Sequence, residues 1–130
     1  MKQLEKGITG SAELTVTKNE LASAVGSGCL DVLATPVMIM LMEKAACECI
    51  APYLEGDETT VGTALDVKHI SATPEGMRVK AVAELVSIDG RELVFSVNAE
   101  DGSGLIGKGV HKRFLVNIRR FMEKANAKKH

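Results

Sequence analysis

The sequence predicts an α+β fold in which an antiparallel sheet wraps around one long central helix and a short helix ends the chain. An almost unbroken apolar run follows Thr35-Pro36, and β-branched residues dominate from Thr59 onward. Asp89-Gly90 is a strong two-residue hairpin signal, and Asp101-Gly102-Ser103-Gly104 is a good longer turn. One strand, one apolar helix and four strands joined by turns predict two layers, because the sheet has to cover the helix.

The elements are expected in the following order. Residues 8–17 alternate loosely between apolar and polar side chains and predict a first strand. The less regular residues 19–31 predict a flexible cover. Thr35 is the expected N-cap of the main helix, with Pro36 at the first helical position, where a missing N–H does least harm. That helix is expected to stop near Pro52-Tyr53-Leu54. Four strands and an amphipathic C-terminal helix are expected at residues 60–70, 77–88, 92–99, 105–116 and 117–129.

Length and composition predict a single domain over residues 1–130. Its 130 residues are enough for a real core, and 45% hydrophobic with 25% charged residues is typical of a globular chain. A formal net charge of −1 provides no basic field for nucleic acid or an anionic membrane, so small-molecule or protein partners are favoured. No apolar stretch is long enough to span a bilayer and residues 1–6 do not resemble a signal peptide, which favours a cytoplasmic location.

The cysteines and histidines predict neither disulfides nor a metal site. Cys29, Cys47 and Cys49 are odd in number, and two of them lie two residues apart on the predicted helix, where they point to different faces. We therefore expect all three to be small buried hydrophobes. Three scattered histidines do not make a metal site, and no phosphate-binding loop is recognisable, so no metal or cofactor is expected.

Glu43 is the most informative residue for function. It lies in the middle of the main helix, on a stripe that is otherwise apolar, and the expected stripe is Pro36, Ile39, Met40, Glu43, Cys47 and Ile50. An unpaired buried carboxylate costs several kcal/mol or more, so such a group pairs, takes up a proton or lines a polar cavity. Glu43 is therefore a candidate for acid–base or nucleophilic chemistry, with a buried ion pair as the structural alternative.

Several stretches together resemble the fluoroacetyl-CoA-thioesterase-like family of hotdog-fold thioesterases. They extend over nearly the whole chain and match in spacing as well as in residue type. The stretches are Gly26-Ser27-Gly28, Leu33-Ala34-Thr35-Pro36, Glu43-Lys44-Ala45-Ala46, Thr59-Thr60-Val61-Gly62-Thr63, Asp66-Val67-Lys68-His69, Thr73-Pro74-Glu75-Gly76 and Gly109-Val110-His111-Lys112-Arg113-Phe114.

The resemblance implies a homodimeric acyl-CoA thioesterase with a hotdog fold and its active sites at the subunit interface, and it leaves tetramerisation open. It also implies catalytic roles for Thr35, Glu43 and His69 and substrate-binding roles for Gly62 and Arg113. Coenzyme A would enter only as part of the substrate. The fluoroacetyl-specific enzyme closes its pocket with aromatic side chains before the main helix, whereas residues 21–33 contain none. This difference predicts a loose lid and ordinary short acyl groups rather than a fluorinated one.

The chemistry of thioester hydrolysis gives each of these residues a role. Glu43 can attack the carbonyl carbon or activate a water, and the residues do not choose between the two. His69 can hold or activate the attacking group, and the Thr35 hydroxyl lies at the positive end of the helix dipole, where an oxyanion is stabilised. Gly62 offers a backbone donor from another segment.

Structural roles compete with each of these assignments. Thr35 can be a simple helix cap, and His69, on one strand face with Leu65 and Val67, can be a satisfied core histidine. His111 and Arg113 alternate with Lys112, a pattern typical of solvated strand charges. Two other functions remain open: a hotdog-fold hydratase or dehydratase acting on an acyl thioester, and a non-catalytic acyl-CoA-binding module.

Overall fold

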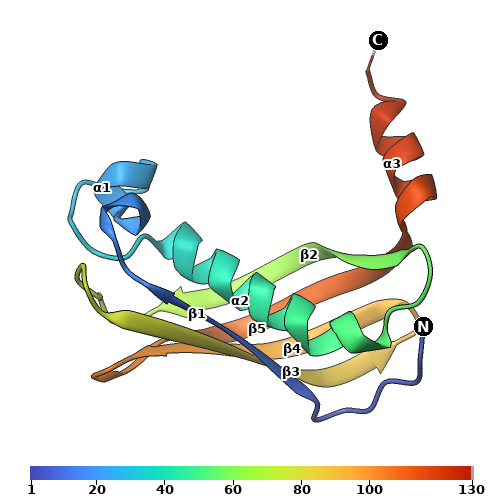
Figure 1. The fold of residues 1–130 in the computed structure, drawn as a ribbon, viewed down its shortest axis with the longest axis horizontal. Coiled ribbons are helices and arrows are strands. Elements are labelled where there is room, and N and C mark those ends of the chain that lie inside the picture. The colour runs from blue at the N-terminus through green and yellow to red at the C-terminus, as the bar shows by residue number, and fades with distance from the viewer. Residues whose placement is uncertain (130) are drawn as a thin grey trace.

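The computed structural model describes residues 1–129, and Figure 1 shows one long helix lying across a curled sheet. Two short helical turns precede this helix, and a further helix ends the chain. The strands are β1 Thr9–Thr15, β2 Glu58–His69, β3 Arg78–Asp89, β4 Glu92–Asp101 and β5 Gly104–Asn117. The helices are η1 Lys18–Glu20, α1 Ala22–Val25, α2 Thr35–Ile50, η2 Ala51–Tyr53 and α3 Ile118–Asn126.

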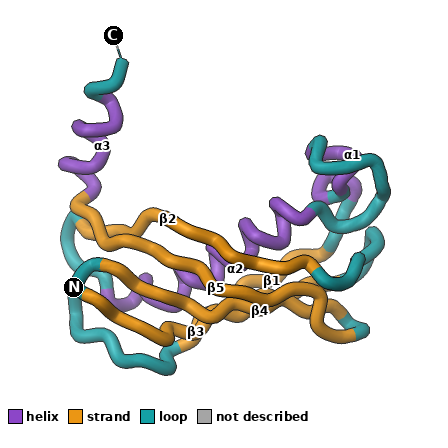
Figure 2. The backbone as a smooth tube through the Cα atoms, turned by 180° about the vertical axis from the view of Figure 1, so that it is seen from behind, coloured by secondary structure: helices purple, strands orange, loops and turns teal. Residues whose placement is uncertain are grey.

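The five strands form one antiparallel sheet in the order β1-β3-β4-β5-β2, which Figure 2 shows from the side opposite α2. β3, β4 and β5 are consecutive hairpin partners, as the glycine turns predict. β1 and β2 are the two edge strands of the sheet. The sheet curls around α2, so the predicted hotdog architecture is confirmed.

The main helix begins one residue earlier than its sequence suggests. Ala34 has extended backbone angles (φ −68°, ψ 137°) and is the N-cap, so Thr35 is the first helical residue rather than the cap. No side chain caps the helix, and Pro36, predicted at the first helical position, is the second helical residue. α2 ends at Ile50, and the turn η2, which contains Pro52, follows it.

The face of α2 that enters the core is not the predicted stripe. The buried residues are Met38, Leu41, Met42, Ala45, Ala46, Cys49 and Ile50, and they pack with inward-facing strand residues such as Leu85, Phe95 and Ile106. Of the predicted stripe, only Ile50 is fully buried, whereas Met40 is 51% exposed. Because residues 37–42 are all apolar, the run itself does not specify a side, and packing against the sheet chooses one.

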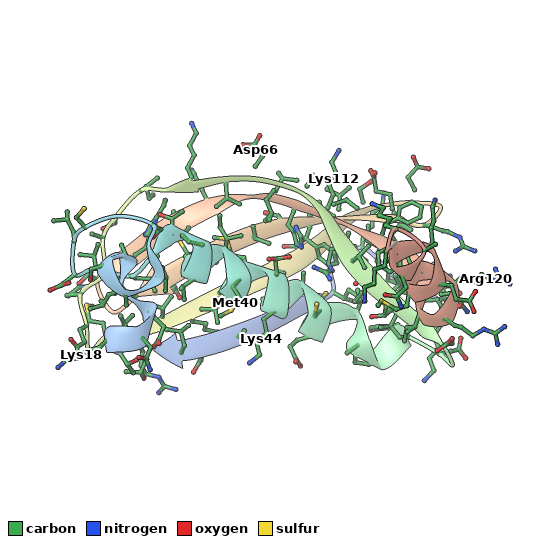
Figure 3. All side chains as sticks on the ribbon, turned by 90° about the horizontal axis from the view of Figure 1, so that it is seen from above. Lys18, Met40, Lys44, Asp66, Lys112 and Arg120 are labelled. Atoms are coloured by element: carbon green, nitrogen blue, oxygen red, sulfur yellow. The ribbon has the colours of Figure 1, made fainter. Side chains whose placement is uncertain are left out.

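One further expectation is wrong, and one structural alternative is excluded. Of the cysteines, only Cys49 is buried, whereas Cys29 and Cys47 are exposed. His111 and Arg113 are both buried rather than solvated, and Figure 3 shows Lys112 between them pointing to the outer side of the sheet. Strand alternation therefore puts the two flanking side chains on the inner face with α2.

The predicted cover is a folded segment. Leu21 pairs with Leu33 and Val32 pairs with Pro74 in isolated β-bridges, and Ser23 donates a 2.6 Å hydrogen bond to Asp31. The segment of residues 21–33 includes α1 and lies over the start of α2 (Figure 1). None of the helices formed by residues 1–129 has the length and apolar character needed to cross a membrane.

Candidate active site

The start of α2 meets the end of β2 through Thr35 and His69. The Thr35 Oγ1 and His69 Nδ1 atoms are 2.7 Å apart, which is a short hydrogen bond. Burial lowers the pKa of His69, so the imidazole is neutral at pH 7. His69 Nε2 is buried and has no hydrogen-bond partner among residues 1–129. A neutral histidine with one engaged and one unengaged nitrogen is suited to bind or orient a reacting group.

A cavity of about 310 Å³ lies beside this pair. Its lining comes from the cover, the first turn of α2 and the chain after β2, and the lining residues are Ala22, Ser27, Val32, Leu33, Thr35, His69, Ile70, Ser71 and Ala72. The walls are mostly small or apolar side chains, and the polar side chains among them are Ser27, Thr35, His69 and Ser71. This combination is typical of a site for a small organic ligand.

Glu43 belongs to a second cluster, two turns further along α2. Its Oε2 atom lies 3.6 Å from Nη1 of Arg113, and the two side chains are 39% and 7% exposed, respectively. Gly62 lies directly against this carboxylate, because a Cβ atom at that position would be 2.9 Å from Glu43 Oε2. A glycine at position 62 therefore lets the carboxylate lie against the backbone of β2.

Arg113 is held in place by Thr60 and His111. Arg113 Nε donates to Thr60 Oγ1 at 2.9 Å, and Nη2 donates to the Thr60 carbonyl at 3.0 Å. Arg113 Nη1 lies 3.1 Å from His111 Nε2. Four polar contacts, including the ion pair with Glu43, fix a guanidinium that is almost entirely buried.

His111 has a defined tautomer in this cluster. Its Nδ1 lies 2.9 Å from the carbonyl of Ala64, so Nδ1 carries the proton and donates, and Nε2 is the acceptor for Arg113. The ring is completely buried and stacks on Phe95, with centroids 6.2 Å apart. Burial and, to a smaller extent, the Arg113 charge lower the pKa of His111, so the ring is neutral and supports Arg113.

His111 and Thr60 are members of the cluster that the sequence did not single out. The register of the β4–β5 hairpin could have indicated that His111 is buried, because it pairs Leu93 with Arg113 and Phe95 with His111. Side chains on paired residues share a face of the sheet, so the apolar residues of β4 mark His111 and Arg113 as inward-facing. Thr60 carries no comparable signal in its local sequence.

The two clusters are separate within one chain. Thr35 and Glu43 are eight residues apart, or about 12 Å along the helix. In the part of the chain that the structure describes, no hydrogen bond or ion pair links Glu43 to Thr35 or His69. The structure thus joins Thr35 with His69, and Glu43 with Gly62 and Arg113, but it does not join the two groups directly.

A larger hollow of about 540 Å³ lies elsewhere, on the outer face of the sheet. Its lining includes Asp66, Lys68, Asn98 and Lys108, and Figure 3 shows Asp66 pointing away from α2. Neither cluster borders it. Within residues 1–129, no group of three histidine, cysteine or carboxylate side chains is placed to hold a metal ion.

Comparison with known proteins identifies relatives with the same fold. A family model described as fluoroacetyl-CoA-specific thioesterase (FlK) matches residues 16–119. The fluoroacetyl-CoA thioesterase of Streptantibioticus cattleyicolor is 44% identical over 98 residues, covering 75% of this chain and 70% of that protein.

Two solved structures match this chain over almost its full length. The structure of the fluoroacetyl-CoA thioesterase FlK matches with a TM-score of 0.93 at 33% identity, over 99% of this chain and 100% of that one. A thioesterase superfamily member from Thermus thermophilus matches with a TM-score of 0.85 at 28% identity, over 98% of this chain and 100% of that one. From the match over residues 16–119 and the 44% identity, we conclude that the chain belongs to the fluoroacetyl-CoA-specific thioesterase family.

Proposed function

We propose that this protein is an acyl-CoA thioesterase that hydrolyses a small or medium acyl-CoA to the free acid and CoA. The observation that supports it best is the placement of Glu43. Its carboxylate is partly accessible, it lies against Gly62, and it is oriented by an arginine that Thr60 and His111 hold in place. A preorganised carboxylate of this kind is suited to attack a thioester or to activate a water molecule.

The two routes use the same residues and give the same products. In the first, a Glu43 oxygen bonds to the carbonyl carbon, the C–S bond breaks, and water then hydrolyses the mixed anhydride. In the second, Glu43 takes a proton from water as the water oxygen bonds to the carbonyl carbon, and the C–S bond breaks as the tetrahedral state collapses. In both, Thr35 and His69 bind the thioester, and the Gly62 backbone lies close to the reacting carbon.

We further propose that the active unit is a homodimer formed along β2. Within residues 1–129 this strand pairs only with β5, so its other edge is unpaired, and Leu65 on the strand exposes an apolar side chain. An exposed strand edge with apolar neighbours is a ready template for a second copy. Antiparallel pairing of two β2 strands about a two-fold axis would bring Glu43 of one subunit towards Thr35 and His69 of the other.

The size of the Thr35–His69 cavity supports a short acyl group. Its volume of about 310 Å³ is at the lower end of the 300–1,000 Å³ that is typical of small-molecule sites. We assign the acyl group to this cavity, because in the β2 dimer the carbonyl carbon would then lie between the Thr35 hydroxyl of one subunit and the carboxylate of Glu43 from the other.

The experiment that tests the function is a thiol-release assay over a panel of acyl-CoAs, with Glu43→Gln as the inactive control. Release of free CoA by the wild-type protein, but not by Glu43→Gln, supports hydrolysis. A hydratase or dehydratase would change the acyl group without releasing thiol, and a binding module would bind acyl-CoA and leave it intact. Either of these results would contradict the proposal.

A further inference from the structure

Within residues 1–129, helix α3 carries an apolar face that stays exposed, although Phe121 also borders a shallow hollow with Phe114 and Leu115 of β5. No residue of α3 is buried, and Ile118, Phe121 and Met122 are all exposed large apolar side chains. The three positions share one face of the helix, since they are separated by three and four residues. Exposed apolar side chains grouped on one helix face favour a partner that covers them.

The base of α3 fixes its place relative to β2. Ile118 N donates to the Asp57 carbonyl at 2.8 Å, and Arg119 N donates to Asp57 Oδ2 at 3.3 Å. Asp57 directly precedes β2, so α3 starts beside the beginning of that strand. Figures 1 and 2 show that α3 then extends beyond the β2 edge of the sheet, away from β5.

The α1 segment lies at the other end of the same strand. Figures 1 and 3 show α1 and α3 at opposite ends of the molecule, with the length of β2 between them. The cavity at Thr35 and His69 is at the α1 end, because His69 is the last residue of β2. Around it, Val25, Leu30 and Ile70 are exposed apolar residues.

Two-fold symmetry brings these two apolar surfaces together. When two β2 strands pair antiparallel, the start of one lies beside the end of the other. Helix α3 of one subunit then extends over the end of the partner's β2, where the partner's His69 and Ile70 lie. In this arrangement α3, which extends beyond the β2 edge of its own subunit, lies beside the acyl cavity of the partner.

We infer that α3 of each subunit closes the acyl cavity of the other, with Phe121 as the aromatic residue over the partner's Thr35–His69 pair. This inference rests on the proposed function and on its β2 dimer. It explains how the site is covered although residues 21–33 contain no aromatic residue. Phe121 and Phe114 are the two aromatic side chains that the structure exposes within residues 1–129, and Phe121 is on the helix that extends outward.

The charge of the C-terminal segment agrees with this position. Residues 118–129 contain five lysines and arginines against Glu123, although the whole chain has a formal net charge of −1. CoA carries several negative phosphate charges, and a positive helix at the mouth of the cavity attracts such a substrate.

Cross-linking tests the inference without reference to activity. In a Cys29→Ser/Cys47→Ser background, which removes the two exposed native thiols, Ile70→Cys and Phe121→Cys are introduced together and treated with a short bismaleimide. Within one chain these positions are separated by the length of β2, about 40 Å, so the reagent cannot join them there. We expect a covalent dimer as the main product.

A matched pair controls for random collision. Phe121→Cys with Lys80→Cys places the second thiol on β3, three strands away from β2, and should give little covalent dimer. A dimer confirmed by native mass that forms no Ile70–Phe121 cross-link overturns this inference but leaves the proposed function standing. A protein that is monomeric by mass overturns both the inference and the β2 dimer, whereas the thiol-release assay tests hydrolysis independently.

Steady-state kinetics provide a second measurement. Phe121→Ala should raise KM for a short acyl-CoA by about tenfold, the effect expected for loss of one aromatic contact, and should change kcat less. Phe121→Leu keeps an apolar side chain and should restore most of the affinity. An unchanged KM in a dimeric Phe121→Ala protein would contradict a covering role.

Discussion

The Thr35 hydroxyl lies 2.7 Å from Nδ1 of His69 and is not used to cap its own helix. Ala34 is the N-cap, so the hydroxyl is available to a side chain that arrives from the end of β2. Two elements far apart in sequence thereby form one polar pair at the wall of an otherwise largely apolar cavity. The pair has the chemistry to bind a carbonyl oxygen, and it is the first target for mutagenesis.

Replacing Thr35 tests this pair directly. Thr35→Ala removes the hydroxyl and should reduce kcat/KM by about tenfold to a thousandfold, the range seen when one oxyanion donor or acid–base partner is lost. Thr35→Ser keeps the hydroxyl and should retain much of the activity. Thiol-release kinetics with both variants provide the measurement, and equal activity in Thr35→Ala and the wild type would exclude the hydroxyl from the reaction.

Glycine at position 62 is expected to be required by Glu43. Gly62→Ala places a Cβ atom 2.9 Å from Glu43 Oε2 and 3.2 Å from His111 Cε1, so the carboxylate has to move. A displacement of this size should reduce kcat on the order of tenfold to a hundredfold. Gly28→Ala is the matched control, because its added methyl group would make an ordinary 3.6 Å contact with Ala22 Cβ. Similar kinetics for the two variants would contradict the assignment of Glu43.

Mixed dimers test whether each site is shared between subunits. Glu43→Gln should reduce turnover about a hundredfold or more, and Thr35→Ala should also be impaired. In a shared-site dimer, a mixed dimer of the two variants gathers both lesions in one site and leaves the other site wild type, so activity returns.

The mixture is prepared by reversible dissociation of the two variants, and native mass confirms that mixed dimers have formed. If Thr35 and Glu43 act within a single chain, every site keeps one lesion. A confirmed mixed dimer as inactive as its parents would then exclude the shared arrangement.

Acid should weaken both activity and stability. Burial lowers the folded-state pKa of His69 and His111 below the ordinary value of about 6.5. The stability that depends on these two neutral histidines is therefore fully present above about pH 6.5. As the pH falls towards their lowered pKa values, the unfolded chain binds more protons than the folded chain, so the free energy of unfolding decreases. The kcat/KM should fall over the same range as His69 becomes protonated.

Urea unfolding at about pH 7.5 and pH 5 provides the measurement. The pKa of Glu58 is lowered by its hydrogen bond to the N-terminal amine, and that of Asp101 is lowered by its hydrogen bond to Thr73. Protonation of these two carboxyl groups therefore affects stability only at a lower pH than protonation of the histidines. The His111→Gln variant should lose part of the acid-induced change. The same pH dependence in this variant and in the wild type would exclude His111 as a source of it.

Discrimination for fluoroacetyl-CoA should be weak. Residues 21–33 contain no aromatic residue, so this segment lacks the bulky side chains that would reject ordinary acyl groups. The values of kcat/KM for fluoroacetyl-CoA, acetyl-CoA and butyryl-CoA should lie within about two orders of magnitude of one another. A preference of several orders of magnitude for the fluorinated substrate would contradict this expectation.

The order and type of the elements could be predicted from the sequence alone, because their signals are local. β-branched runs between glycine turns specify β2 to β5, and the apolar run after Pro36 specifies α2. Resemblance in motif spacing selected Thr35, Glu43, Gly62, His69 and Arg113 as candidates. The structure brings Thr35 to His69, and Glu43 to Gly62 and Arg113, and their catalytic roles stay predictions.

Only the tertiary structure decided which side chains are buried. The run at residues 37–42 is apolar on every side, so contact with the sheet rather than periodicity selected the face that includes Met38 and Met42. The same contact placed His111 and Arg113 inside and left Met40 exposed to solvent. Burial depends on which surfaces meet in space. A sequence pattern gives the period of an element but does not specify which other element will cover it.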